Sequence, residues 1–106
     1  MTWSKKLFIG EEAKKKKISY LWKLKRGKSV FGLYVITLAS NPVNQLDIID
    51  SKEFMGKKHL RKDAVIVGIA KGYDDAVELV NHMAQVTVTR TGGADIRGFL
   101  TEEAGL

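Results

Sequence analysis

The chain of 106 residues contains no cysteine, and this absence removes several classes of protein at once. Without thiols there is no disulfide framework, no cysteine nucleophile and no zinc or iron–sulfur site ligated by cysteine. No apolar run approaches the length of a membrane span, and the run near the N-terminus is only Leu7-Phe8-Ile9. That run is far shorter than the core of a secretory signal or a membrane span, so we expect a cytoplasmic protein without a membrane segment.

Motifs that carry catalysis or metal binding are missing as well. The only histidines, His59 and His82, have no partner at metal-ligand spacing, and we expect both at the surface. The chain has no nucleophile elbow and no HExxH sequence. Asp74, Asp75 and Glu78 gather three carboxylates, but without a loop of cation-binding spacing they favour an ordinary helix start over a Mg²⁺ or Ca²⁺ site. The sequence therefore favours a non-catalytic protein and predicts neither a metal nor a cofactor.

Positive charge is what the chain has in excess, and it is concentrated near the N-terminus. The formal net charge is +6. Residues 1–31 hold ten Lys and Arg against two Glu, whereas residues 32–106 hold eight against ten acidic residues. The basic character therefore belongs to the first third of the chain.

Residues 11–26 are predicted to form the helix that carries this charge, with Gly10 as N-cap and Gly27 just beyond its end. The spacing of the apolar residues predicts a buried face, made of Ile18, Leu21 and Trp22 with Leu24 on its flank. Residues 14–17 are four consecutive lysines that surround the helix, so this turn is expected to project into water.

Eight cations of this region, interleaved with Tyr20 and Trp22, have the composition of a nucleic-acid surface, in which cations contact phosphates and rings stack on bases. The candidate residues are Lys14, Lys15, Lys16, Lys17, Lys23, Lys25, Arg26 and Lys28. A second basic segment, residues 57–62, could extend this surface. The competing interpretation is that the lysines only keep the protein solvated while both rings pack into the core.

The rest of the chain reads as two strand–turn–helix units. Residues 30–39 and 64–70 are nearly continuous in apolar residues, which is typical of strands covered on both faces. Helices are expected over residues 42–54, with Pro42 at the first position, and from Tyr73 onwards. Successive units of this kind form a right-handed crossover, which predicts parallel strands and helix starts at the same edge of the sheet.

The C-terminal part allows two interpretations. Residues 86–89 alternate like a strand, and Gly92-Gly93 could form a hairpin turn. We prefer a helix that reaches about Arg90, with Gly92 as its C′ residue, because Arg90 suits a helix C-terminus. Its expected buried face is Ala76, Val77, Val80, Met83 and Ala84.

The predicted fold is a single α/β domain over residues 1–106, with a mostly parallel, single-layer sheet of three to four strands and three helices. Residues 2–9 and 96–100 are the further strand candidates. So small a sheet has exposed edges, and pairing between two copies would cover them, which makes a homodimer one of the expectations.

Two turns at the predicted helix starts are candidate anion sites. The turn GIAKG carries Lys71 but matches neither glycine-rich phosphate motif, and Asp74 and Asp75 already satisfy the helix dipole there. Residues 40–44 carry no acid and are the better candidate, through Ser40, Asn41 and Asn44. Helix capping accounts for the same residues without any ligand.

Several segments, namely LWKLKRGK, LYVITLASNP, QLDII, VIVGIAKGYDDAVELV and TGGADIRGFL, resemble a group of small uncharacterised bacterial α/β proteins of about this length. The resemblance implies no activity, cofactor or catalytic residue, and it favours a long last helix followed by a short strand.

Two functional hypotheses follow from the sequence. The first is a small non-catalytic binding protein that contacts nucleic acid or an acidic partner through the basic helix of residues 11–26. The alternative is a ligand-binding or regulatory module that holds an anion or nucleotide near residues 40–44.

Overall fold

The computed structural model describes residues 1–41 and 43–105. Along the chain the strands are β1 (Thr2–Ile9), β2 (Leu33–Leu38), β3 (Leu46–Asp50) and β4 (Val65–Lys71). The helices are a 3-10 turn (Ala13–Lys16), α1 (Lys17–Lys25), α2 (Ser51–Gly56), α3 (Lys58–Arg61), α4 (Tyr73–Thr91) and α5 (Ile96–Glu103). The predicted α/β class is confirmed, but the described residues contain five α-helices where three were expected.

The four strands form one mixed sheet in the order β1-β4-β2-β3. Only β1 and β4 are parallel, whereas β2 is antiparallel to both of its neighbours. The prediction of a mostly parallel sheet is therefore wrong. Because β2 and β4 run in opposite directions, the turns that follow them lie at opposite ends of the sheet.

The cause of this error is the segment after β2. The expected helix over residues 42–54 is absent: residues 46–50 form β3, and α2 begins only at Ser51. Leu46 and Ile48 pack on one face of the sheet and Ile49 on the other, so a spacing that also suits a helix is used by a strand. Pro42, the predicted first residue of that helix, lies outside the described residues.

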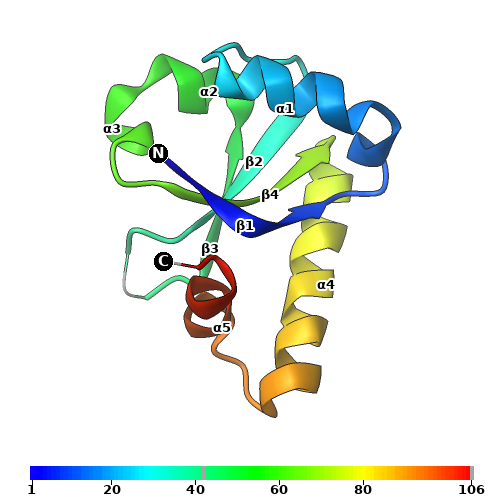
Figure 1. The fold of residues 1–106 in the computed structure, drawn as a ribbon, viewed down its shortest axis with the longest axis vertical. Coiled ribbons are helices and arrows are strands. Elements are labelled where there is room, and N and C mark those ends of the chain that lie inside the picture. Colours follow the sequence, from blue (N-terminus) through cyan, green and yellow to red (C-terminus); the bar gives the residue numbers. More distant parts are fainter. Residues whose placement is uncertain (42, 106) are drawn as a thin grey trace.

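Helices cover both faces of the sheet (Figure 1). On one face, α1, α2 and α3 enclose a core in which Leu24 and Phe54 pack near Val35 and Ile69 of the strands. On the other face, α4 and α5 enclose a second core that includes Ile36, Val67, Leu79, Met83 and Leu100. Coverage on both sides explains why β2 and β4 are nearly continuous in apolar residues. No helix among the described residues is long and apolar enough to cross a membrane.

β4 contains a bulge that adjusts this packing. Ile36 pairs with Gly68 and Thr37 with Ile66, so Val67 is an extra residue in its strand. A side chain on Gly68 would begin 2.7 Å from the methyl group of Met83 and 3.1 Å from the carbonyl of Phe8. Glycine at this position therefore lets α4 lie directly against the sheet.

The predicted buried face of the N-terminal helix is wrong in part. Ile18 and Trp22 are 81% and 59% exposed, and the residues that face the sheet are Ala13, Tyr20 and Leu24. The helix carries two apolar stripes, and only its packing against the sheet decides which one is buried. The first turn is a 3-10 helix, so the regular helix is also shorter than the predicted span of residues 11–26.

The long helix α4 confirms the preferred interpretation of the C-terminal part. It ends at Thr91, and Gly92 has φ +73° and donates its N–H to the carbonyl of Val88 at 2.8 Å. Its buried residues include Ala76 and Met83 as predicted. Val80 packs partly buried against the same core, but Val77 is 37% exposed. Leu79 and Thr87, at i+4 spacing on either side of Met83, complete the buried face.

The strand predicted over residues 96–100 is wrong, because this segment forms the helix α5. Asp95 caps its start by accepting the N–H of Gly98 at 3.0 Å. α5 crosses the sheet from the β2–β3 loop, where Arg97 donates to the carbonyl of Asn41, to β1, where Glu103 pairs with Lys6. These tertiary contacts hold α5 across the sheet.

Candidate functional site

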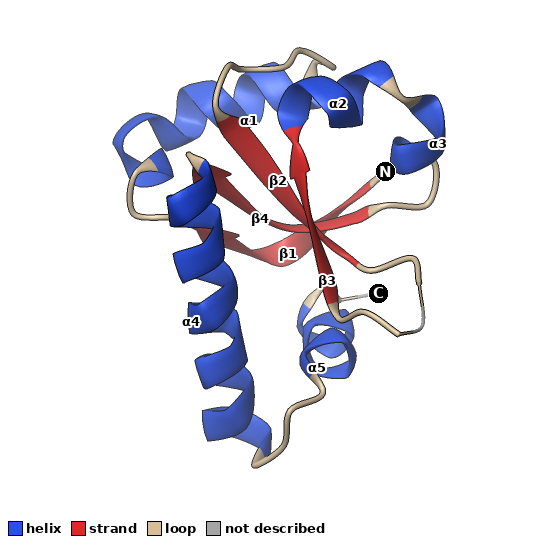
Figure 2. Cartoon of the chain, turned by 180° about the vertical axis from the view of Figure 1, so that it is seen from behind, coloured by secondary structure: helices blue, strands red, loops and turns tan. Residues whose placement is uncertain are grey.

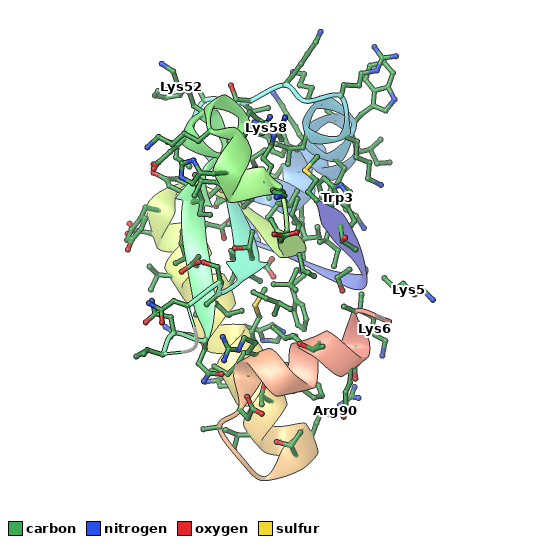
Figure 3. All side chains as sticks on the ribbon, turned by 90° about the vertical axis from the view of Figure 1, so that its left-hand side faces the viewer. Trp3, Lys5, Lys6, Lys52, Lys58 and Arg90 are labelled. Atoms are coloured by element: carbon green, nitrogen blue, oxygen red, sulfur yellow. The ribbon has the colours of Figure 1, made fainter. Side chains whose placement is uncertain are left out.

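The predicted cationic residues lie in one layer of the molecule. All eight candidates from Lys14 to Lys28 are exposed. α1 lies beside α2 and α3 on the same side of the sheet, so the basic segment of residues 57–62 joins this layer (Figure 1). Figure 3 shows Lys52 and Lys58 projecting from this end of the molecule, whereas Arg90 lies at the other end. We call the surface formed by the 3-10 turn, α1, α2 and α3 the basic layer.

Charge is segregated between the two helical layers. Residues 11–32 and 51–63, which build the basic layer, hold thirteen Lys and Arg against four acidic residues, a balance of +9. Residues 72–106, which build the α4–α5 layer, hold two Arg against six acidic residues, a balance of −4. A molecule with this charge distribution orients a polyanion toward one side.

Local ion pairs neutralise only part of the basic layer. Lys14 pairs with Glu11 and Lys15 with Glu12, both at 2.8 Å, and the hydrogen bond that Lys15 donates to the Glu12 carboxylate raises the pKa of Lys15. These pairs are exposed and contribute little to stability. Among the described residues, no ion pair involves the other α1-region lysines, namely Lys16, Lys17, Lys23, Lys25 and Lys28.

Two side chains of the basic layer also serve the fold. Arg61 donates to the carbonyls of Phe54 and Met55 at the end of α2, and Lys25 lies 5.3 Å from the ring centre of Trp3. A structural role therefore explains part of the positive charge.

Trp22 is an exposed aromatic ring on α1 of the basic layer. It was expected in the core, together with Tyr20, if the lysines were only a solvated face. Tyr20 is indeed buried at 8% exposure, but Trp22 is 59% exposed, with the guanidinium carbon of Arg26 3.9 Å from its ring centre. Such a cation–π contact holds the ring in place while part of its surface stays open. Phe31, in the loop after α1, is 96% exposed.

The candidate anion residues do not form one site. Ser40, Asn41 and Asn44 lie in the loop between the antiparallel strands β2 and β3, where no helix begins among the described residues. Asn41 instead accepts the N–H of Val43 at 2.7 Å and so stabilises the turn. Anion binding there stays a prediction, but without the helix N-terminus on which it rested.

Lys71 lies at the opposite end of the sheet, in a hollow of about 470 Å³ lined largely by acidic side chains. These are Glu11, Glu12, Asp74, Asp75 and Glu78. Asp75 is 6% exposed and accepts the backbone N–H of Lys71 at 2.9 Å. An anion that approached Lys71 would meet five carboxylates.

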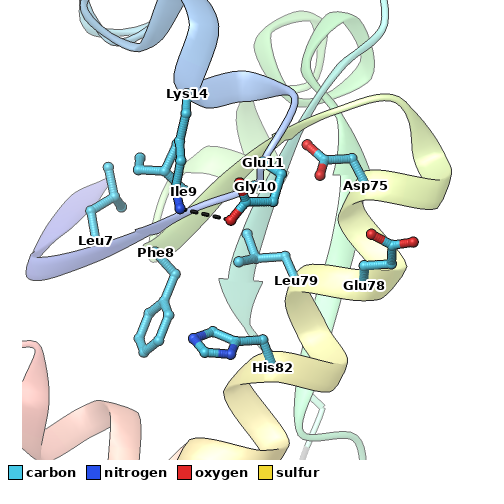
Figure 4. A pocket seen from close by; sticks show the side chains of 10 residues that line it. All are labelled: Leu7, Phe8, Ile9, Gly10, Glu11, Lys14, Asp75, Glu78, Leu79 and His82. Carbon is cyan, nitrogen blue, oxygen red and sulfur yellow. Dashed lines mark hydrogen bonds and ion pairs between the residues drawn. The ribbon is translucent and has the colours of Figure 1, made fainter.

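A second hollow, of about 490 Å³, lies between the end of β1 and α4. Figure 4 shows His82 of α4 pointing toward Phe8 of β1, Glu78 pointing toward the side of Asp75, and the Lys14–Glu11 ion pair beside the end of β1. His82 contacts Phe8 edge to face, with ring centres 6.0 Å apart. Both histidines are exposed as predicted, and the described residues contain no group of three or more side chains able to hold a metal ion.

A larger cavity, of about 900 Å³, was not anticipated from the sequence. It lies at the end of the sheet where β2 finishes and β4 begins, and its lining includes Ser40 but also Thr37, Asp47, Asp63 and Arg97. Thr37 sits within an apolar strand and Asp47 within a segment expected to be helical, so neither carried a signal that could be recognised without the sheet.

Comparisons of the chain with protein-family models, curated proteins and solved structures give no match. The resemblance to small bacterial proteins therefore stays a prediction, and the short final strand that it favoured is a helix in the structure.

Proposed function

We propose that this chain is a non-catalytic module that binds single-stranded nucleic acid through its basic layer. The observation that supports the proposal best is the segregation of charge, with +9 in the segments of the basic layer and −4 in those of the α4–α5 layer. Each lysine–phosphate contact releases counterions from the nucleic acid, and this release drives binding. Such binding therefore needs many cations on one surface that are not already in ion pairs.

Exposed rings favour a single strand over a duplex. Single-strand binders combine a cationic track with aromatic rings on which bases stack, and stacking needs a ring that is open and fixed in place. Trp22 fits this requirement because it is exposed and held by Arg26 within the cationic surface. α1 itself lies flat against the sheet with Leu24 fully buried, which suits a surface track better than insertion of the helix into a groove.

The first test compares two variants with the same net charge. Lys17→Gln/Lys23→Gln/Lys28→Gln removes three cations from the basic layer, and Lys5→Gln/Lys71→Gln/Arg90→Gln removes three from outside it. Fluorescence anisotropy with labelled oligo(dT) is measured over a series of salt concentrations. The basic-layer variant should lower the slope of log K against log[salt] by about 2, since each contact contributes about 0.7 for single strands. Equal losses in both variants would show that only net charge matters.

The second test separates nucleic acid from an acidic protein. An abasic oligonucleotide of the same length carries the same phosphates but offers no bases. Trp22→Ala should weaken oligo(dT) binding about tenfold, because stacking of one base contributes ~1–3 kcal/mol, and should leave abasic binding unchanged. If wild-type protein binds poly-glutamate and the abasic strand as tightly as oligo(dT), the partner is an acidic protein or any polyanion.

The proposal includes a cytoplasmic location, where such strands are accessible. A homodimer built on the edge strands β1 and β3 stays a separate prediction, to be measured by sedimentation.

A further inference from the structure

The cavity at the end of β2 is bordered by elements from both helical layers. α3 and α5 lie on opposite sides of this end of the sheet, close to the β2–β3 loop (Figure 2). The cavity, of about 900 Å³, is lined by residues of all three elements and of β4. Its volume falls within the usual range for sites that hold small molecules.

Thr37 is the first sign that the cavity is built for a ligand. Its side chain lines the cavity although the residue is only 3% exposed. No hydrogen bond joins its hydroxyl group to any described residue. The described residues also contain no side-chain polar atom that is both sealed from solvent and unbonded, so this hydroxyl opens into the cavity.

The other buried hydroxyl groups make the contrast clear. Ser4 donates to the carbonyl of Lys6, Ser51 to that of Val30, and Thr87 to that of Met83. Buried polar groups are normally bonded in this way. Thr37 is the exception among the four buried Ser and Thr residues that the structure describes.

The walls of the cavity decide the charge of the ligand. Four carboxylates line it, those of Asp47, Asp63, Asp95 and Glu102, and none of them forms an ion pair with a described residue. The other charged or titratable side chains that line the cavity are those of Arg97 and His59. Arg97 donates to the carbonyls of Ala39 and Asn41. An anion would therefore meet an excess of carboxylates.

Asp47 and Thr37 lie directly opposite each other in the β2–β3 ladder. Side chains at opposed positions project from the same face of a sheet, with their Cβ atoms about 5 Å apart. A carboxylate and a hydroxyl at this separation can accept hydrogen bonds from one ammonium group placed between them. The remaining carboxylates can hold a second donor group further along the cavity.

We propose that this cavity binds a small organic cation with a protonated amine, which donates to Asp47 and Thr37. This inference is independent of nucleic-acid binding, and it reverses the charge of the ligand expected near Ser40 from the sequence.

Titration with 1,4-diaminobutane, followed by NMR of the backbone amides and by calorimetry, tests the proposal. Amide shifts should change at residues 37, 47 and 63 at millimolar diamine. Two controls define the chemistry: 1,4-butanediol has the same length without charge, and tetramethylammonium has the charge without N–H donors. Neither should bind.

Matched variants then test the two anchoring residues. Thr37→Val and Asp47→Asn should each weaken the diamine about tenfold, as expected for a lost hydrogen bond to a charged group. Thr37→Val should melt no lower than wild type, because no bond of its hydroxyl is lost. Asp74→Asn, on α4, makes the same chemical change outside the cavity and should leave binding unchanged.

Several results would overturn the proposal. These are unchanged amide shifts at residues 37 and 47 in wild-type protein, equal binding of butanediol or tetramethylammonium, and an Asp74→Asn effect as large as that of Asp47→Asn.

Discussion

The contact between Gly10 and Asp75 joins the end of β1 to the first turn of α4, and Gly10→Ala should break it. A Cβ atom on Gly10 would lie 2.2 Å from one carboxylate oxygen of Asp75 and 2.7 Å from its carboxyl carbon. Gly10 is not among the glycines with positive φ, so alanine meets no backbone strain there. The cost must come from displacing the carboxylate.

The size of the effect follows from what Asp75 does. Its carboxylate accepts the N–H of Lys71 at 2.9 Å in a position that is 6% exposed. Losing a buried hydrogen bond to a charged group costs about 1.5–3 kcal/mol. We expect Gly10→Ala to lower the free energy of unfolding by about 2 kcal/mol, which corresponds to a fall in Tm of roughly 10 °C for a domain of this size.

Urea denaturation of a double-mutant cycle measures the contact itself. In an Asp75→Ala background the carboxylate that the new Cβ atom would meet is absent. Gly10→Ala should then be neutral, or should stabilise the protein by about 0.4–1 kcal/mol because alanine lowers the conformational entropy of the unfolded chain. Gly56→Ala is the matched control, because no atom lies within 4 Å of its added Cβ and its φ is not positive. If Gly10→Ala lowers the free energy of unfolding equally in the wild-type protein and in the Asp75→Ala variant, the reasoning is refuted.

Two further predictions concern single contacts. Lys6 bonds to Glu103 at 2.8 Å and lowers the pKa of Glu103 below its ordinary value of 4.5. Because the folded-state pKa is lowered, this contribution to stability is present above pH 4.5 and is lost as the pH falls through the folded-state pKa. In Lys6→Gln the pKa should return toward 4.5, as measured by NMR titration of the carboxyl carbon, and an unchanged value would assign the shift to another group. Gly92→Ala should cost about 1 kcal/mol in denaturation experiments, since φ is +73° there. Gly93→Ala, where φ is not positive and the added Cβ meets only Thr91 Oγ1 at 3.8 Å, should be nearly neutral, and equal costs would contradict the cap assignment.

Local pattern was enough to predict several elements of the fold. The strands now seen as β2 and β4 were predicted because each is dense in apolar residues, and the further strand candidate over residues 2–9 is β1 in the structure. The end of α4 was predicted because Gly92 gives a conformational signal that needs no tertiary context. The exposure of His59 and His82 was predicted as well.

Topology was beyond the reach of local pattern. Leu46, Ile48 and Ile49 suit one face of a helix as well as two faces of a strand, and only pairing with β2 decides between them. Because residues 46–50 form a strand, β4 runs antiparallel to β2 and not parallel to it as predicted. Lys71 therefore lies at the opposite end of the sheet from Ser40.

The sequence by itself determined where the positive charge lies along the chain, which segments are apolar and where α4 must stop. The tertiary structure alone decided which stripe of α1 is buried, and therefore that Trp22 faces solvent while Tyr20 does not. It also placed Thr37 opposite Asp47 at the end of an open cavity. The physical reason is that charge and local conformation belong to neighbouring residues, whereas burial and cavities depend on how separate segments pack.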